Sequence, residues 1–225
     1  QVVDQNGQLN KDVLYLYHDG LFNLELKTGG FSYEVFEIQQ EANDLYESGK
    51  RNADDQPSQK NIFSHRVDVN FEGANRNIVP QTFDETSSYT NYIFAPVSTN
   101  QHLQVRGFGK IVYPNLYNGI DLVFYSPNEK EGKELSYEFI VHPGADLSKI
   151  KFNYSGATDF SMTASGDFLL HTSYGFIRET APKYLIDGKE IFADSKFLLH
   201  QNTKTFSVCN YDQSQTLVID PNMLW

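Results

Sequence analysis

Large apolar residues occupy every second position in several short stretches of this chain, most clearly between residues 134 and 141 (ELSYEFIV). A period of two places such side chains on one face of a β-strand, so this stretch predicts a strand with one buried face. The run at 120–125 (IDLVFY) is apolar and rich in β-formers, and predicts the strand before it. Pro143-Gly144 then ends the pairing, because proline lacks an N–H donor and glycine accepts a positive φ.

The same alternation returns at 64–72, where Val67, Val69 and Phe71 are predicted to point inward. Asp187-Gly188 indicates a two-residue type I′ hairpin turn, since both of its positions need a positive φ. Residues 73–88 show no regular period, which predicts an irregular segment. The remaining predicted strands are short and are apolar or alternating: 13–17, 21–26, 31–38, 92–95, 103–113, 158–163, 167–171, 175–179, 183–186, 190–193, 196–200, 205–209 and 216–219.

About fifteen short strands separated by turns predict an all-β protein. We expect a large multi-stranded antiparallel β-sandwich, either a single supersandwich-like body or two sandwich halves at 1–98 and 99–225. One helical or 3₁₀ turn is expected at 146–150. The polar segment 39–60 lacks any strand period and predicts a long exposed loop, which serves either as a recognition loop or as a tolerated insertion.

The net charge of −11 argues against a nucleic-acid partner, because the chain has no basic stripe that could displace counterions from phosphate. It suits an extracellular or periplasmic surface. No run of 18 apolar residues exists, so no membrane insertion is expected. The single cysteine, Cys209, excludes an internal disulfide, and its alternating surroundings favour a half-buried strand position over a reactive thiol.

The sequence has no GxSxG elbow and no HExxH motif. Glu134 and Glu138 would lie about 13 Å apart on one strand, farther than the ~5–9.5 Å between glycosidase carboxyls. Asp121 has apolar neighbours and is expected to accept hydrogen bonds from the turn at 117–119; the alternative is a carboxyl group with a raised pKa. We therefore expect no catalytic residues and no enzyme.

A calcium site is the one cofactor that the sequence leaves open. Asp4 and Asn6, near the start, and Asp54 and Asp55, in the polar segment, offer loop oxygens of the kind that calcium prefers. Neither segment matches the twelve-residue calcium loop with its terminal bidentate acid. The primary expectation is therefore no cofactor, with calcium as the alternative.

A sugar-stacking platform is the other candidate site, since the chain has 14 Tyr, 17 Phe and one Trp. Most tyrosines fall inside predicted strands at packing periodicity, which favours a structural role. Tyr46, Tyr89 and Tyr117 are predicted to lie in loops, and they are the candidates for contact with a glycan.

Several motifs follow one another in the order of a known family. They include YPNLYNGIDLVFY at 113–125, LSYEFIVHPGADLSKIKFNYSGA at 135–157, HRVDVNFEGAN at 65–75 and TLVIDPNMLW at 216–225. The chain resembles the N-terminal domain of bacterial secreted proteins that continue into β-propeller-type (SBBP) repeats. The same domain heads Bacteroidetes surface proteins with PKD or immunoglobulin-like modules and a gliding-motility or type IX sorting tail. The chain departs from the family at His102, where relatives often have Trp.

The resemblance implies a non-enzymatic structural or adhesion-type module of a secreted or cell-surface protein. Its partners would be the downstream modules of the same chain and a cell-surface glycan or protein. Because the chain starts at Gln1 and ends after an apolar run at Trp225, we interpret 1–225 as one module of a longer multidomain protein. The alternatives are a carbohydrate-binding or carbohydrate-processing β-sandwich and a calcium-dependent adhesion module.

Overall fold

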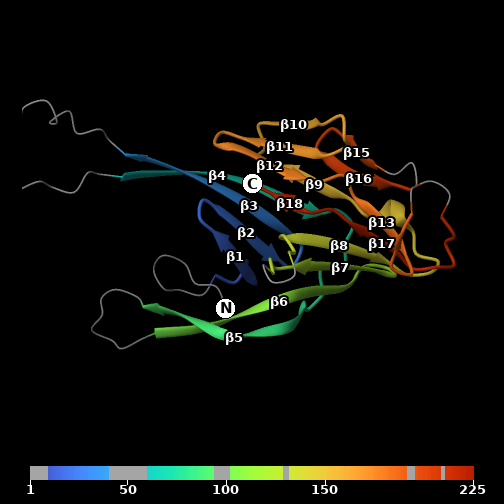
Figure 1. The fold of residues 1–225 in the computed structure, drawn as a ribbon, viewed down its shortest axis with the longest axis horizontal. Coiled ribbons are helices and arrows are strands. Elements are labelled where there is room, and N and C mark those ends of the chain that lie inside the picture. Colours follow the sequence, from blue (N-terminus) through green and yellow to red (C-terminus); the bar gives the residue numbers. More distant parts are fainter. Residues whose placement is uncertain (1–9, 41–59, 94–101, 129–131, 192–195, 209–210) are drawn as a thin grey trace, which may run out of the picture.

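Antiparallel strands in three sheets make up the protein (Figure 1). The computed structural model describes residues 10–40, 60–93, 102–128, 132–191, 196–208 and 211–225. The first sheet has seven strands in the order β1 (Tyr15–Asp19), β2 (Phe22–Lys27), β3 (Gly30–Gln40), β4 (Lys60–Phe71), β9 (Phe152–Ser155), β16 (Thr203–Ser207) and β15 (Lys196–His200). The second sheet also has seven, in the order β14 (Lys189–Glu190), β13 (Lys183–Ile186), β17 (Leu217–Asp220), β8 (Ser136–Val141), β7 (Ile120–Tyr125), β6 (His102–Tyr117) and β5 (Gln81–Ile93). The small sheet has the order β10 (Asp159–Met162), β11 (Phe168–Thr172), β12 (Gly175–Glu179) and β18 (Met223–Leu224).

The all-β class and the antiparallel sandwich architecture are thus confirmed. Both seven-stranded sheets contain strands from the segments 1–98 and 99–225: β9, β16 and β15 follow β1 to β4 in the first sheet, and β5 lies at the edge of the second.

The second sheet and the small sheet cover the same face of the first sheet. Phe152 and Tyr154 are two residues apart on β9, so both point to one face. The Phe152 ring lies 5.4 Å from the Phe139 ring of β8, between ring centroids, and the Tyr154 ring lies 5.5 Å from the Phe168 ring of β11. The core is therefore one aromatic-rich layer that all three sheets share.

The alternating sequence patterns correctly predicted several strands and their buried faces. β7 has the predicted bounds, and β8 buries Tyr137, Phe139 and Val141 as expected. Val67, Val69 and Phe71 of β4 are likewise buried. The Asp187-Gly188 turn has φ values of 49° and 73°, as a type I′ hairpin requires. The expected helical turn is a 3₁₀ turn, η3 (Leu147–Lys149), capped by Asp146.

The prediction of an irregular segment at 73–88 is wrong for its second half. Residues from Gln81 onward form β5, which pairs with β6 over its length with a register shift between Glu85 and Tyr89. The described β5 side chains are mostly polar and exposed, so the strand carries no period-two signal. β6 is also longer than predicted and is irregular between Tyr113 and Tyr117, where Pro114 cannot donate to the ladder.

Two long hairpins, β3–β4 and β5–β6, extend from the body toward the same side (Figure 1). The ends of the predicted 39–60 loop are strand residues, since β3 runs to Gln40 and β4 starts at Lys60. The rest of that loop, 41–59, lies outside the described residues. Near the end of the first hairpin, Ile38 pairs with Ile62, and both side chains are exposed.

Gly30 opens β3 where the backbone of β4 comes close, and we expect Gly30→Ala to destabilise the protein by about 1–3 kcal/mol. A Cβ at this position would lie only 2.1 Å from the Val69 carbonyl oxygen, which pairing holds in place. Gly29→Ala is the matched control, because its Cβ would meet only the flexible tip of Arg76. Urea unfolding of both variants measures the difference. Equal losses of stability in Gly30→Ala and Gly29→Ala would contradict a clash with the β4 backbone.

Candidate functional site

A lysine and a glutamate meet in the protein interior where the three sheets join. Lys204 lies on β16 of the first sheet, in the alternating segment Thr203–Ser207, which also turns Phe206 inward. Glu179 ends β12 of the small sheet, two residues after the buried Ile177. Lys204 Nζ is in direct contact with Glu179 Oε2. Both side chains are fully buried, with exposed fractions of 0% and 1%.

Three tyrosines supply hydrogen bonds to this pair. Tyr33 of β3 and Tyr154 of β9 both donate to Glu179 Oε1, with O–O distances of 3.3 and 3.2 Å. Tyr137 of β8 donates to Glu179 Oε2 at 2.5 Å and accepts from Lys204 Nζ at 3.0 Å. The second sheet thus contributes Tyr137, and the cluster draws a member from every sheet.

Aromatic rings surround the ammonium group. Ring centroids lie 4.8–5.9 Å from Lys204 Nζ, a range in which the negative face of a ring attracts a cation. Six described residues provide these rings: Tyr137, Phe152, Tyr154, Phe168, Phe197 and Phe206. This cage excludes water from the pair and strengthens the electrostatic interactions inside it.

Burial controls the protonation of the cluster. It lowers the pKa of Lys204, because the charged form loses its hydration, and the neighbouring Glu179 only partly opposes this. Burial and the adjacent Glu179 raise the pKa of Tyr33, Tyr137 and Tyr154 well above the ordinary value of 10.0. The three hydroxyls therefore remain protonated donors at neutral pH. The cluster combines an amine, a carboxyl group and three proton donors, but it is closed to any dissolved substrate.

Lys204 and Glu179 were not predicted as site residues, since a charged residue in or beside a short strand suggests a solvent-facing position. A signal was present: each residue is two positions from an inward apolar residue, Phe206 and Ile177 respectively. A charged residue in phase with a buried face indicates a buried, paired charge, because an unpaired one would be too costly.

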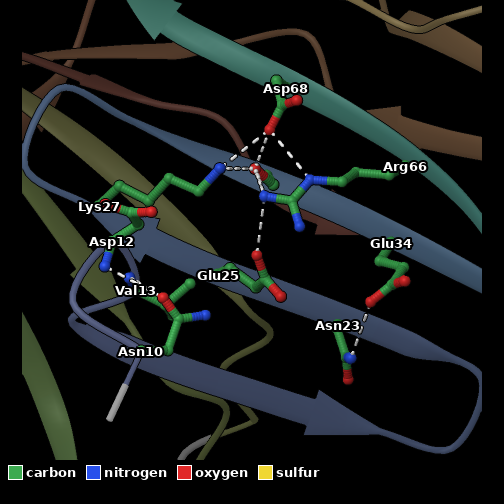
Figure 2. A network of polar contacts seen from close by, with 10 residues as sticks. Asn10, Asp12, Val13, Asn23, Glu25, Lys27, Glu34, Arg66 and Asp68 are labelled. Carbon is green, nitrogen blue, oxygen red and sulfur yellow. Dashed lines mark hydrogen bonds and ion pairs between the residues drawn. The ribbon is translucent and has the colours of Figure 1, made fainter. Parts of the chain in front are cut away.

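A second polar network lies on the outer face of the first sheet (Figure 2). Lys27 Nζ donates to Ser32 Oγ at 2.6 Å and to Asp68 Oδ1 at 2.9 Å. Arg66 Nε donates to Asp68 Oδ1 at 3.1 Å, and its Nη2 lies 3.0 Å from Glu25 Oε2. These residues are cross-strand neighbours on β2, β3 and β4, so the network fastens the register of this part of the sheet.

Asp68 makes this network sensitive to acid. Burial opposes its ionisation, but hydrogen bonds from Ser32, Lys27 and Arg66 outweigh it and lower the pKa of Asp68 from 3.8 to about 2. A carboxylate with a depressed pKa in the folded state stabilises the protein above its unfolded pKa, and loses that contribution as the pH falls toward the folded pKa.

We expect Asp68→Asn to be less stable than the parent by up to about 1 kcal/mol at neutral pH, because the carboxylate is 42% exposed and solvent screens its contacts. This difference should shrink as the pH falls from 3.8 to about 2 and disappear below it. Unfolding measured by urea at a series of pH values tests this. A difference that stays constant with pH would show that Asp68 acts by packing and not by charge.

Next to this network, the surface has a hollow of about 360 Å³. Its lining includes Lys27, Asp68, Asn70 and Arg76. Gly29 of the β2–β3 turn and Gly30 at the start of β3 also line it. Charged and amide side chains on an open surface are suited to hydrogen bonding with a polar ligand.

The candidate glycan residues do not come together among the described residues. Tyr117 was predicted in a loop, but it ends β6 and is buried; its hydroxyl donates to the Lys151 carbonyl at 3.1 Å, so its ring face is not free for stacking. Tyr89 is exposed as expected, although it lies in β5 and not in a loop. Tyr46 lies outside the described residues.

The calcium candidates Asp4, Asn6, Asp54 and Asp55 all lie outside the described residues, and so does Cys209. Among the residues that the structure does describe, no three His, Cys, Asp or Glu side chains converge as metal ligands. The calcium alternative therefore remains a prediction from the sequence.

The three carboxyl candidates of the sequence are Asp121, Glu134 and Glu138. Asp121 accepts a hydrogen bond from the Asn115 N–H at 2.7 Å, and its Oδ2 lies 2.8 Å from His142 Nε2. The donor is Asn115, in the irregular part of β6 between Tyr113 and Tyr117, and not the predicted turn at 117–119. Glu138 accepts from the Tyr125 hydroxyl at 2.9 Å, whereas Glu134 is exposed.

A family model described as Domain of unknown function (DUF7948) matches residues 3–222. Neither a curated protein nor a solved structure matches the chain. In the described part of the chain, no helix has the length and apolar character needed to cross a membrane.

Proposed function

The chain belongs to the family described as Domain of unknown function (DUF7948), and we propose that it is a non-enzymatic structural module of the adhesion type in a longer secreted or cell-surface bacterial protein. The buried cluster of Lys204 and Glu179 is the observation that carries this proposal. Its reactive groups are closed to dissolved substrates and instead join three sheets. Such an interior suits a module that stays folded when its partners on either side exert a pulling force on it.

The outer surface supports contact with partners. Ile62 and Phe63 on the β3–β4 hairpin and Tyr89 on the β5–β6 hairpin are exposed by 67%, 40% and 55%. Large apolar side chains exposed on extended hairpins favour contact with another protein surface. The proposed partners are the downstream modules of the same chain and a cell-surface protein or glycan.

The non-enzymatic part of the proposal is tested with a panel of glycoside, ester and peptide substrates. We expect no turnover above that of the heat-unfolded protein. The variants Asp121→Asn and Glu138→Gln accompany the test, since these are the candidate carboxyls of the sequence. Turnover that disappears in either variant would overturn the proposal.

The adhesion part is tested in the full-length protein on cells, by attachment under shear flow. We expect attachment to fall when 1–225 is deleted and to fall partly in Ile62→Ser/Phe63→Ser. Phe176→Ser is the matched control, because Phe176 is equally exposed but lies on β12 in the body. Immunolabelling confirms equal surface amounts. Attachment that is unchanged by the deletion would contradict an adhesive role.

The hollow beside Lys27 favours a second candidate function, the binding of a carbohydrate. Its charged and amide side chains could hydrogen-bond to sugar hydroxyls. A glycan array with the parent and with Asn70→Ala, Arg76→Ala and Tyr89→Ala tests this. Binding that is lost in the first two variants favours the hollow, whereas loss in Tyr89→Ala alone favours a stacking platform. A blank array counts against this function.

A further inference from the structure

The Lys204 amine and the Glu179 carboxyl group are the two components of an amide bond, and the fold holds them in contact. They belong to different sheets, β16 and β12, and are 25 residues apart in the chain. Nζ touches Oε2, which is one covalent bond away from the carboxyl carbon Cδ. Fixing two reactants in contact removes the entropic cost of bringing them together.

The surroundings favour the neutral form of Lys204. With exposed fractions of 0% and 1%, neither the ammonium nor the carboxylate has water around it. Moving one proton from Nζ to the carboxylate removes both charges from an apolar interior. Burial lowers the pKa of Lys204 in the same direction. A Lys204 side chain that has given up this proton is a free amine, which is the nucleophilic form of lysine.

The tyrosines divide between the two carboxyl oxygens in a way that suits an addition reaction. Oε1 receives two donors, Tyr33 at 3.3 Å and Tyr154 at 3.2 Å. Attack on Cδ would place negative charge on this oxygen, and two fixed donors would stabilise it. Oε2, which faces the amine, receives Tyr137 at 2.5 Å.

Tyr137 also connects the two reacting groups. Its oxygen accepts a hydrogen bond from Lys204 Nζ at 3.0 Å while its own proton is donated to Glu179 Oε2. A proton can therefore pass from the attacking nitrogen to the leaving oxygen through one hydroxyl, which is restored at the end.

We propose that Lys204 and Glu179 form an intramolecular amide bond after the chain has folded. The Nζ–Cδ bond forms, and the Cδ–Oε2 bond breaks. Oε2 leaves as one water molecule with two protons from Nζ, one of which passes by way of Tyr137, and the third proton of Nζ stays on the amide nitrogen. Oε1 becomes the amide carbonyl oxygen and keeps its bonds from Tyr33 and Tyr154. The step needs no oxidant, reductant or other reactant.

Such a bond would tie the small sheet covalently to the first sheet across the core. The chain between residues 179 and 204 would become a closed loop that unfolding cannot open. The aromatic cage would protect the bond from hydrolysis by excluding water. The inference does not depend on the proposed adhesive function, since its evidence is a mass and a peptide map.

Mass spectrometry of the intact chain, denatured after folding, tests the proposal. We expect a mass lower than that of the sequence by one water molecule. Asp19-Gly20 and Asp187-Gly188 can also lose water by forming succinimides, so a protease digest must locate the loss. The expected product is one branched peptide that joins Lys204 to Glu179.

Three variants test the reaction. Lys204→Arg keeps the positive charge but cannot form this amide, so it should retain the mass of its sequence. Glu179→Gln can form the same bond by releasing ammonia instead of water. Tyr137→Phe should form the bond about 100-fold more slowly or worse, because the relay is lost. Complete amide formation at the parent rate in Tyr137→Phe would contradict proton transfer through the Tyr137 hydroxyl.

The parent protein decides the main question even where a variant does not fold. A folded parent, judged by its circular dichroism, that keeps the mass of its sequence after prolonged incubation at neutral pH would overturn the proposal. So would a water loss that maps only to an Asp-Gly pair. In either case the cluster is a buried ion pair and nothing more.

Discussion

Replacing Glu179 with leucine is expected to lower the free energy of unfolding by about 3–5 kcal/mol, the usual cost of removing one member of a buried ion pair. The substitution leaves Lys204 buried, with the Tyr137 oxygen as its one acceptor among the described residues. Tyr137 and Tyr154 also lose their acceptor, although Tyr33 still reaches Met223 Sδ at 3.3 Å. Each buried donor without a partner adds about 1–3 kcal/mol.

Lys204→Met is expected to cost less than Glu179→Leu. The carboxyl group then keeps all three tyrosine donors, and methionine fills much of the space inside the aromatic cage. Urea unfolding with linear extrapolation gives both values. Lys149→Met is the control, because Lys149 is 66% exposed and its loss should change stability by less than about 0.5 kcal/mol. Losses below about 1 kcal/mol in both core variants would contradict the assigned role.

These two variants do not separate an ion pair from an amide. Neither variant can form the bond between Lys204 and Glu179, so a covalent link would add its own stabilisation to the loss in both. The mass of the parent chain settles that question, and the unfolding data then show how much the cluster contributes. The two experiments are therefore complementary.

The second large effect is expected for Phe152→Ala, which should cost about 3–5 kcal/mol. Phe152 is fully buried on β9, at the centre of the layer that the first two sheets share. Its ring centroid lies 5.5 Å from that of Phe31, 5.2 Å from Phe71 and 5.4 Å from Phe139. Alanine would leave a cavity lined by rings that belong to different sheets, which cannot all move inward to fill it.

Phe176→Ala is the matched control for this core variant. Phe176 is 52% exposed on β12, and its only described ring neighbour is His171, with a centroid distance of 6.2 Å. We expect its loss to change stability by less than about 0.5 kcal/mol. Thermal unfolding followed by circular dichroism, together with urea titration, compares the two. Similar losses of unfolding free energy in the two variants would mean that the shared aromatic layer is not the main source of stability.

The sequence predicted the strands whose side chains alternate between core and solvent. β7 and β8 were predicted well because Tyr137, Phe139 and Val141 are buried by the pleat of their own strand, which is a local property. β5 was predicted only in part, because it is held by backbone pairing with β6 and has little buried surface of its own. The prediction that Tyr117 lies in a loop was wrong, because its burial depends on a turn that is distant in the sequence and does not affect the local pattern.

The candidate site could not be predicted in the same way. Lys204 and Glu179 can each be recognised as charged residues in phase with a buried face, yet the sequence does not indicate that they face each other. The two side chains meet because the small sheet and the second sheet pack side by side on the same face of the first sheet. The three tyrosines come from strands β3, β8 and β9, which meet only in the assembled protein.

The sequence by itself determined the all-β class, the core positions of the alternating strands and the type I′ turn at Asp187-Gly188. These features follow from steric rules and from burial within a few neighbouring residues. The tertiary structure decided which strands share a sheet and which charged side chains meet in the interior. Those choices depend on the free energy of the whole packed arrangement, in which residues far apart in the chain exclude water together, and no short segment contains that information.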